Sequence, residues 1–114
     1  MSDDAYDNLA SATGFDWDAG NAPKVRSRHN VGPGECEQAF FSEPFIVAAD
    51  VAHSKLERRW RALGRTVAGR HVFIIFTMRG TLIRVISARN MNRKERLQYA
   101  QAQKRSEAHS DIQD

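Results

Sequence analysis

The chain has 114 residues, of which 41% are hydrophobic, so it suits one domain with a modest core and leaves little room for a second. Its formal net charge is only +3, but residues 1–20 carry five acids and no base, whereas residues 53–96 carry twelve bases against two acids. The single cysteine, Cys36, excludes an internal disulfide, and the longest strongly apolar run, at residues 72–76, is too short to span a bilayer, so we expect a cytoplasmic protein.

The first half of the chain predicts one short strand and two helices. Residues 1–13 are polar and acidic, and we expect them to be a disordered tail. The sequence FDWD at residues 15–18 alternates aromatic and acidic side chains, which is the pattern of a short strand with one buried face. Residues 19–31 and 32–44 then predict two helices, the first with Pro23 in its first turn.

The second half of the chain predicts strands and then one more helix. Aromatic and β-branched residues separated by turn residues are typical of antiparallel strands. The expected strands cover residues 45–50, 56–67, 71–78 and 81–89. A helix follows over residues 90–110, where Asn92 and Glu95 have the spacing of a capping box. Its apolar stripe is thin, so we expect it to be held loosely and to fray after Gln103.

This order of elements predicts an α+β domain at residues 14–103, followed by a polar C-terminal tail at residues 104–114. We expect an antiparallel sheet of about four strands, with two N-terminal helices on one face and a C-terminal helix. The other face would carry the arginines. No acidic residue lies between Arg79 and Arg89 to neutralise them, so the sheet must expose these charges to water or offer them to a ligand.

The basic segment favours a polyanionic ligand, of which nucleic acid is the commonest. A metal site is not favoured, because Glu57 and Glu95 are the only acids there, the four histidines are widely spaced and no phosphate-binding glycine loop is present. We therefore expect no cofactor. RNA carries its own nucleophile in the 2′-hydroxyl, so arginines with a few acid–base groups are compatible with metal-independent cleavage through a 2′,3′-cyclic phosphate.

Five segments of the sequence together resemble the BrnT family, the toxin half of bacterial type II toxin–antitoxin pairs. They are FDWDAGNAPKVRSRHNV, HSKLERRWRALGR, GRHVFIIFTMRG, IRVISAR and RKERLQY, in this order between about residues 15 and 100. The resemblance implies a RelE-like fold and a ribonuclease that cleaves RNA and inhibits translation. It also implies a BrnA-like ribbon-helix-helix antitoxin as partner, in a heterotetramer that binds promoter DNA through the antitoxin.

Eleven residues are candidate site residues on these grounds. Arginines are expected to hold phosphate, and a carboxylate, tyrosine or histidine is expected to move protons. The catalytic candidates are Glu57, Arg59, Arg84, Glu95, Arg96 and Tyr99. The candidates for RNA binding are Lys24, His29, His53, Arg79 and Arg89.

These candidates also have ordinary structural roles. Glu57 and Arg59 could form a simple ion pair, and Glu95 could only cap its helix. Tyr99 could anchor the last helix to the core rather than present its ring and hydroxyl to RNA. Three functions therefore stay open: a ribonuclease toxin, a non-catalytic nucleic-acid-binding or antitoxin-binding module using the same basic face, and an inactive toxin that still binds its antitoxin.

Overall fold

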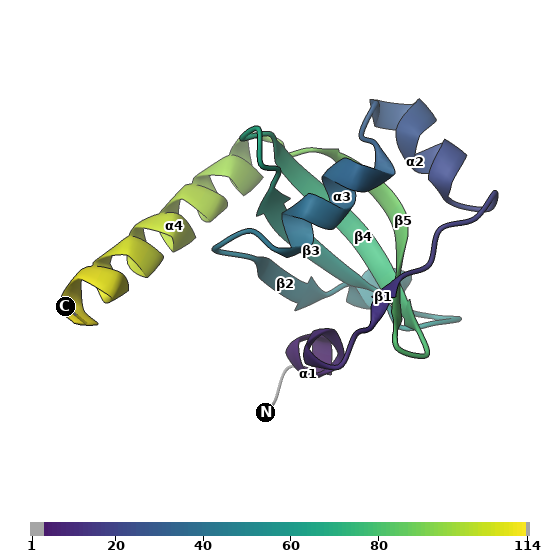
Figure 1. The fold of residues 1–114 in the computed structure, drawn as a ribbon, viewed down its shortest axis with the longest axis horizontal. Helices are drawn as coiled ribbons and strands as arrows, with labels where there is room; N and C mark the ends of the chain where they lie inside the picture. Colours follow the sequence, from purple (N-terminus) through teal and green to yellow (C-terminus); the bar gives the residue numbers. More distant parts are fainter. Residues whose placement is uncertain (1–3, 114) are drawn as a thin grey trace.

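A five-stranded sheet in the order β1-β5-β4-β3-β2 forms the centre of the protein (Figure 1). In this computed structural model, which describes residues 4–113, strands β2 to β5 pair antiparallel and β1 joins the edge of β5 in parallel. The strands are β1 (Gly14–Phe15), β2 (Ile46–Ala49), β3 (Trp60–Arg65), β4 (His71–Arg79) and β5 (Leu82–Asn90).

The helices lie mainly on one side of the sheet. α2 (Ala22–His29) and α3 (Pro33–Phe40) pack on one face, and α1 (Asp4–Ala10) contacts β2. A short 3-10 turn, η1 (Val51–His53), follows β2. α4 (Arg93–Gln113) follows β5 and extends away from the sheet, so its C-terminal end lies far from the other elements (Figure 1).

The main core lies between α2, α3 and the sheet face formed by even-numbered residues of β3 and β4. Trp60 pairs with Phe76 and Ala62 pairs with Ile74, and all four side chains are buried. Full burial of a large apolar side chain contributes roughly 1.5–3 kcal/mol, so this face holds the helices firmly. Cys36 of α3 is buried in the same cluster, and burial raises the pKa of its thiol to about 12, as suits a small hydrophobic residue.

Gly64 allows α3 to lie directly against β3. A Cβ atom at this position would stand 2.7 Å from the carbonyl oxygen of Ala39 in α3 and 3.0 Å from Oγ of Ser42. The Ser42 hydroxyl donates to that same carbonyl oxygen at 2.7 Å and accepts the backbone N–H of Arg65 at 3.2 Å. Only glycine therefore fits where the end of α3 is tied to the sheet.

A β-bulge interrupts the pairing of β4 with β5. Ile75 pairs with Ser87, but the next residue of β4, Phe76, pairs with Val85. Ile86 is therefore one extra residue in β5. Because side chains alternate along a strand, an extra residue reverses which face the following side chains occupy.

The β5 side chains that are buried change from odd-numbered to even-numbered residues at the bulge. Ile83 and Val85 are buried against the helices before the bulge, whereas Ala88 is buried after it. The residues beside Ala88, namely Ser87 and Arg89, consequently lie on the opposite face of the sheet. The bulge thus places polar and charged side chains of β5 on the face that α2 and α3 leave uncovered.

The structure confirms the α+β class and the sequence of two helices, antiparallel strands and a C-terminal helix. Pro23 lies in the first turn of α2, as predicted. The predicted capping box is also present: Asn92 N–H donates to Glu95 Oε1 at 2.8 Å, and Glu95 N–H donates to Asn92 Oδ1 at 2.9 Å. These features depend on local sequence, which explains why the sequence predicts them.

The sheet differs from the prediction in two respects. It is mixed and has five strands, because the short strand predicted at residues 15–18 forms at Gly14–Phe15 and pairs in parallel with the start of β5. β3 begins at Trp60, not at Leu56, because the backbone before it turns: Arg59 N–H donates to Ser54 Oγ at 3.0 Å.

Both ends of the chain contain more helix than predicted. The helix α1 lies in the segment that we expected to be disordered, where Leu9 and Ala12 pack against the main core. α4 continues to Gln113 instead of fraying after Gln103. Residues 100–108 (AQAQKRSEA) consist almost entirely of alanine, glutamine, lysine, arginine and glutamate, which favour helix without needing a packing partner.

Candidate nucleic-acid interface

The sheet face opposite α2 and α3 contains a groove of about 470 Å³ that is rich in arginine. Odd-numbered residues of β3 and β4, and β5 residues around and after the bulge, contribute its floor. β1 pairs only with the first residues of β5, so in the described part of the chain no strand pairs with the rest of that edge, and Arg28 reaches the groove from α2. The lining residues, which we call the arginine groove, are Arg28, Asp50, Arg59, Arg61, Phe73, Ile75, Ile86, Ser87 and Arg89.

Arg59 carries a buried donor that is not satisfied. Its Nε atom has no hydrogen-bond partner in the part of the chain that the structure describes. Its ion pair with Glu57 is long, with 3.7 Å between Nη2 and Oε1, and both side chains are about one-third exposed. A buried donor without an acceptor costs about 1–3 kcal/mol, so an incoming anion that accepts this hydrogen bond is bound favourably.

Two further arginines of the groove, Arg28 and Arg61, are exposed and form no ion pair within residues 4–113. Arg61 comes from the middle of β3, where it pairs with Ile75 of β4. Asp50, at the end of β2, adds a buried carboxylate to the groove. The groove therefore combines cations available to a phosphate with an acidic group at its edge.

Arg89 is oriented by two neighbours. Its guanidinium donates to Glu95 at 2.8 and 3.0 Å, and its Cζ lies 4.0 Å from the centre of the Phe73 ring. Burial opposes ionisation of Glu95, but hydrogen bonds from Arg89 and from the Asn92 backbone hold the pKa of this carboxyl below its ordinary value. Glu95 is thus an ionised residue that caps α4 and positions Arg89.

Glu57, which precedes β3, lies between the side chains of Arg59 and Arg79. Besides Arg59, it accepts a hydrogen bond from Nη2 of Arg79 at 3.2 Å, and the Arg79 side chain is half-exposed. These three predicted site residues are therefore brought together. Glu57 does not line the arginine groove itself, although Arg59 does.

Arg84 does not offer its charge to a ligand in the way the sequence indicated. It forms ion pairs with Asp16 at 3.3 Å and with Asp18 at 3.1 Å, and its side chain is only 12% exposed. The hydrogen bond from Arg84 lowers the pKa of Asp18, so this carboxylate stays ionised. The expectation that no acid neutralises these arginines is wrong, because carboxylates outside residues 79–89 pair with Arg79, Arg84 and Arg89.

Tyr99 and Arg96 hold α4 in place. Tyr99 is fully buried, and its hydroxyl donates to the carbonyl oxygen of Pro44 at 2.6 Å. It is therefore an anchor of the helix and does not present its ring to a ligand. Arg96 donates to the carbonyl oxygen of Met91 at 2.8 Å, just before the helix begins.

The predicted RNA-binding residues of α2 lie beside the arginine groove. Lys24 and His29 are exposed and line a smaller cavity of about 190 Å³ that shares Arg28 and Arg89 with the groove. The cationic surface is therefore continuous from α2 across β5. The side chain of His53 lies outside the part of the chain that the structure describes.

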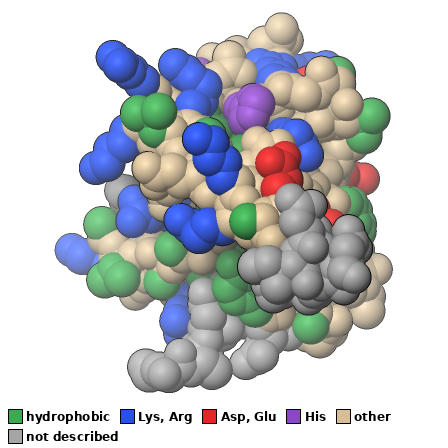
Figure 2. Space-filling view, turned by 90° about the vertical axis from the view of Figure 1, so that its left-hand side faces the viewer, with side chains coloured by type: hydrophobic (Ala, Val, Ile, Leu, Met, Phe, Trp, Pro, Cys, Tyr) green, Lys and Arg blue, Asp and Glu red, His purple; other side chains and the backbone are tan. Residues whose placement is uncertain are grey.

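Charge is unevenly distributed over the face that Figure 2 shows. Seen from the side towards which α4 extends, Lys and Arg side chains lie over the upper and left parts of the surface, whereas acidic side chains lie towards the right (Figure 2). Such a one-sided arrangement attracts polyanions to one region of the surface.

Comparison with known families identifies the family of this chain. The family described as the ribonuclease toxin, BrnT, of type II toxin–antitoxin systems matches residues 17–95. This chain belongs to the BrnT family. As a type II toxin family, BrnT implies an antitoxin partner for the chain. No curated protein matches the sequence at a significant level.

The part of the chain that matches BrnT contains the whole arginine groove. It begins after β1, includes α2, α3 and strands β2 to β5, and ends in the first turn of α4. Among the described residues, no group of three or more His, Cys, Asp or Glu side chains is arranged to hold a metal ion. No helix in residues 4–113 has both the length and the apolar character that crossing a membrane requires.

Several residues of this BrnT-family groove were not among the sequence candidates. Arg61 could have been found from strand alternation, because it shares the face of Leu63 opposite the core. No local sequence pattern predicts that Arg28 and Asp50 line the groove, because their positions depend on how α2 and the end of β2 lie against the sheet. Ser87 reaches the groove only because of the bulge.

Proposed function

We propose that this chain is a metal-independent endoribonuclease that binds the phosphodiester backbone of RNA in the arginine groove. The observation that carries the proposal is the buried Nε of Arg59, which has no hydrogen-bond partner among the described residues and lies in a groove shared with Arg28 and Arg61. An oxygen of a phosphate supplies the missing acceptor, and the neighbouring guanidinium groups balance its charge. Membership of a ribonuclease toxin family supports RNA as the substrate.

The reaction needs no nucleophile from the protein. The 2′-oxygen of the substrate loses its proton and forms a bond to phosphorus, the bond from phosphorus to the 5′-oxygen breaks, and that oxygen takes up a proton. The products are a 2′,3′-cyclic phosphate and a 5′-hydroxyl. The extra negative charge at phosphorus during this step is stabilised by Arg59 and Arg61, since fixed cations act most strongly where charge develops.

Two carboxylates are the candidates for the base that removes the 2′-proton. Glu57 lies 3.7 Å from the Arg59 guanidinium, and Asp50 lines the groove directly. His29, on the cationic surface next to the groove, is the candidate for the acid that protonates the 5′-oxygen. A base that acts in this way produces an acidic limb in the pH–rate profile, and this limb is lost when the base is neutralised.

The test is incubation of the partner-free chain with a short labelled RNA in excess EDTA, followed by analysis of the product ends. We expect cleavage that leaves 2′,3′-cyclic phosphates, and a loss of roughly 100-fold in rate for Arg59→Ala and for Arg61→Ala. Arg105→Ala, an exposed arginine on the distal part of α4, is the control and should cleave normally. The pH–rate profiles of Glu57→Gln and Asp50→Asn identify the base, because the acidic limb should disappear in the variant that lacks it. Intact RNA with the folded wild type would exclude the proposal.

We also propose that cleavage inhibits translation and that a BrnA-like ribbon-helix-helix antitoxin neutralises the chain in a heterotetramer. The support is the type II family, whose toxins act with a protein antitoxin. A cell-free translation reaction tests the first part, with Arg59→Ala as the inactive control. Co-purification of the chain with the antitoxin, followed by light scattering, tests the second, and a mass other than that of two toxins with two antitoxins contradicts it.

A further inference from the structure

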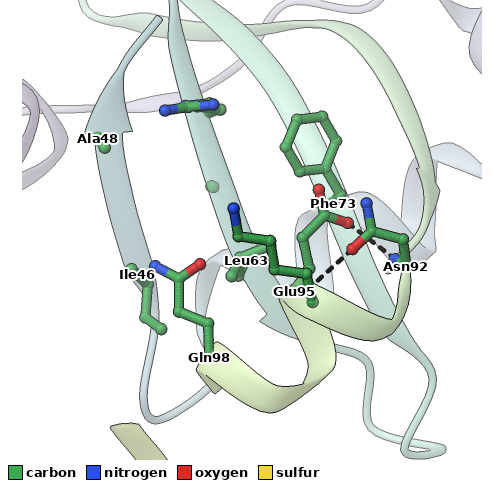
Figure 3. A pocket seen from close by; sticks show the side chains of 10 residues that line it. Ile46, Ala48, Leu63, Phe73, Asn92, Glu95 and Gln98 are labelled. Atoms are coloured by element: carbon green, nitrogen blue, oxygen red, sulfur yellow. Dashed lines mark hydrogen bonds between the residues drawn. The ribbon is translucent and has the colours of Figure 1, made fainter. Parts of the chain in front are cut away.

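A second cavity, of about 300 Å³, lies where the first turns of α4 cross the sheet (Figure 3). Leu63 of β3 and Phe73 of β4 supply apolar and aromatic surface, and Ile46 and Ala48 form the side towards β2. Its volume is at the lower end of the range of small-molecule sites, which is about 300–1,000 Å³. The cavity therefore has the size, and on its sheet side the apolar surface, to receive a flat ring.

This cavity is continuous with the arginine groove. Arg61 and Phe73 line both, so a group that occupies the cavity lies next to whatever the groove binds. In an RNA chain, the group next to a backbone phosphate that is large, flat and partly apolar is a nucleobase. Bases are commonly bound by stacking on aromatic side chains beside a cationic path for the backbone.

The rim of the cavity carries two polar side chains with unused hydrogen-bonding groups. The side chains of Gln98 and Lys94 form no hydrogen bond or ion pair with the described residues, and both line the cavity. By contrast, Asn92 and Glu95 are already joined by capping hydrogen bonds (Figure 3). The Gln98 amide offers one donor and one acceptor side by side, which is the pattern that reads a base edge.

We infer that this cavity is a nucleobase subsite, in which the base adjacent to the bound phosphate contacts Leu63 and Phe73 while Gln98 reads its edge. The inference rests on the proposed function for the identity of the ligand as RNA. Gln98 and Lys94 then determine which nucleotide is bound beside the scissile phosphate. The subsite makes binding base-selective, whereas the arginine groove binds any backbone equally.

The experiment separates binding from cleavage. Four fluorescent 2′-O-methyl hexanucleotides each carry one base, adenine, cytosine, guanine or uracil, among otherwise abasic sugars, so only that base can enter the cavity and the strand cannot be cut. Dissociation constants are measured by anisotropy in EDTA. For the wild type we expect a spread of about tenfold among the four, since one well-made pair of hydrogen bonds to a base edge discriminates by this order.

The variants locate this selectivity in the cavity. Gln98→Ala should reduce the spread to within about twofold without changing the weakest affinity, because phosphate contacts provide the base-independent part. Gln101→Ala, an exposed glutamine of the same helix that does not line the cavity, should leave the spread unchanged. Ala48→Phe fills the cavity from an exposed strand position and should also remove the selectivity.

The outcomes distinguish this inference from the proposed ribonuclease activity. Equal affinities in the wild type, or a spread that persists in both Gln98→Ala and Ala48→Phe, would overturn the subsite even if RNA is cleaved. Selective binding that these variants abolish, combined with intact RNA in the cleavage assay, would support the subsite and contradict the ribonuclease. No binding of any oligonucleotide would overturn both.

Discussion

The guanidinium of Arg89 donates two hydrogen bonds to the carboxylate of Glu95 while it lies over the ring of Phe73. The same carboxylate accepts the backbone N–H of Asn92, so one side chain joins the end of β5 to the first turn of α4. This arrangement fixes the position of an arginine that lines the arginine groove. It also connects the stability of the fold to the ionisation of Glu95.

The ionisation of Glu95 makes stability depend on pH. Burial opposes its charge, but the hydrogen bonds from Arg89 and Asn92 lower its pKa below the ordinary 4.5. A carboxyl whose pKa is lowered in the folded state stabilises the fold at any pH above its pKa in the unfolded state. This contribution is lost as the pH falls through its pKa in the folded state. We expect Glu95→Gln to lower the free energy of unfolding by about 1 kcal/mol at neutral pH, because the pair with Arg89 is partly exposed to solvent.

Urea unfolding between about pH 7 and pH 3 measures this effect, and the difference between wild type and Glu95→Gln should shrink below pH 4.5. Glu107→Gln, an exposed residue on the distal part of the same helix, serves as the control. A difference that stays constant across the range would mean that ionisation of Glu95 contributes nothing.

Tyr99→Phe tests whether this tyrosine only anchors α4. Its hydroxyl is buried and donates to Pro44, so the change should lower the free energy of unfolding by about 1 kcal/mol. Cleavage of RNA by the folded variant should be unchanged. Urea unfolding and a cleavage assay well below the melting temperature measure the two effects, with the half-exposed Tyr6→Phe as a matched control. Loss of cleavage without loss of stability would indicate that the Tyr99 hydroxyl takes part in catalysis.

Arg84→Ala should release the N-terminal segment but preserve the arginine groove. Arg84 pairs with Asp16 and Asp18, and in the same segment the Asp16 N–H donates to the carbonyl oxygen of Ile83 at 2.8 Å. We expect faster hydrogen exchange at the Asp16 amide and a cleavage rate close to that of the wild type. Arg93→Ala, an exposed cation at the start of α4, should change neither. Unchanged exchange at Asp16 would show that other contacts hold this segment.

Arg61→Ala should change the salt dependence of RNA binding. If Arg61 contacts one phosphate, removing it lowers the slope of log affinity against log salt concentration by about 0.7. Titrations of an uncleavable RNA at several salt concentrations measure the slope, with Arg105→Ala for comparison. An identical slope for Arg61→Ala and the wild type would place this side chain away from the RNA backbone.

Gly64→Ala should destabilise the protein. Its new Cβ would meet the carbonyl oxygen of Ala39 at 2.7 Å, so α3 must move from β3. Overpacking of this kind costs about 1–3 kcal/mol, which thermal or urea unfolding resolves readily. Gly34→Ala, where a Cβ has open space around it, is the matched control in α3 itself. Equal stability of the two variants would show that α3 adjusts without cost.

The sequence predicts the elements of this fold better than the contacts of the site. Proline and capping residues mark α2 and α4 locally, and apolar strand residues mark β4, so each can be predicted without tertiary structure. The partner of Arg84, by contrast, is an aspartate 66 residues away, and no local pattern joins the two. The same limitation applies to Arg28, which enters the groove from α2.

The bulge at Ile86 has a consequence for how relatives of this chain are aligned. The presence of one extra residue in β5, rather than side-chain chemistry, determines whether Arg89 faces the arginine groove or the core. A relative that lacks one residue in this hairpin would direct the equivalent arginine inward even if its neighbours were identical. An alignment gap moved by a single position here therefore exchanges groove residues for core residues, so such gaps should be placed from the pairing of β4 with β5.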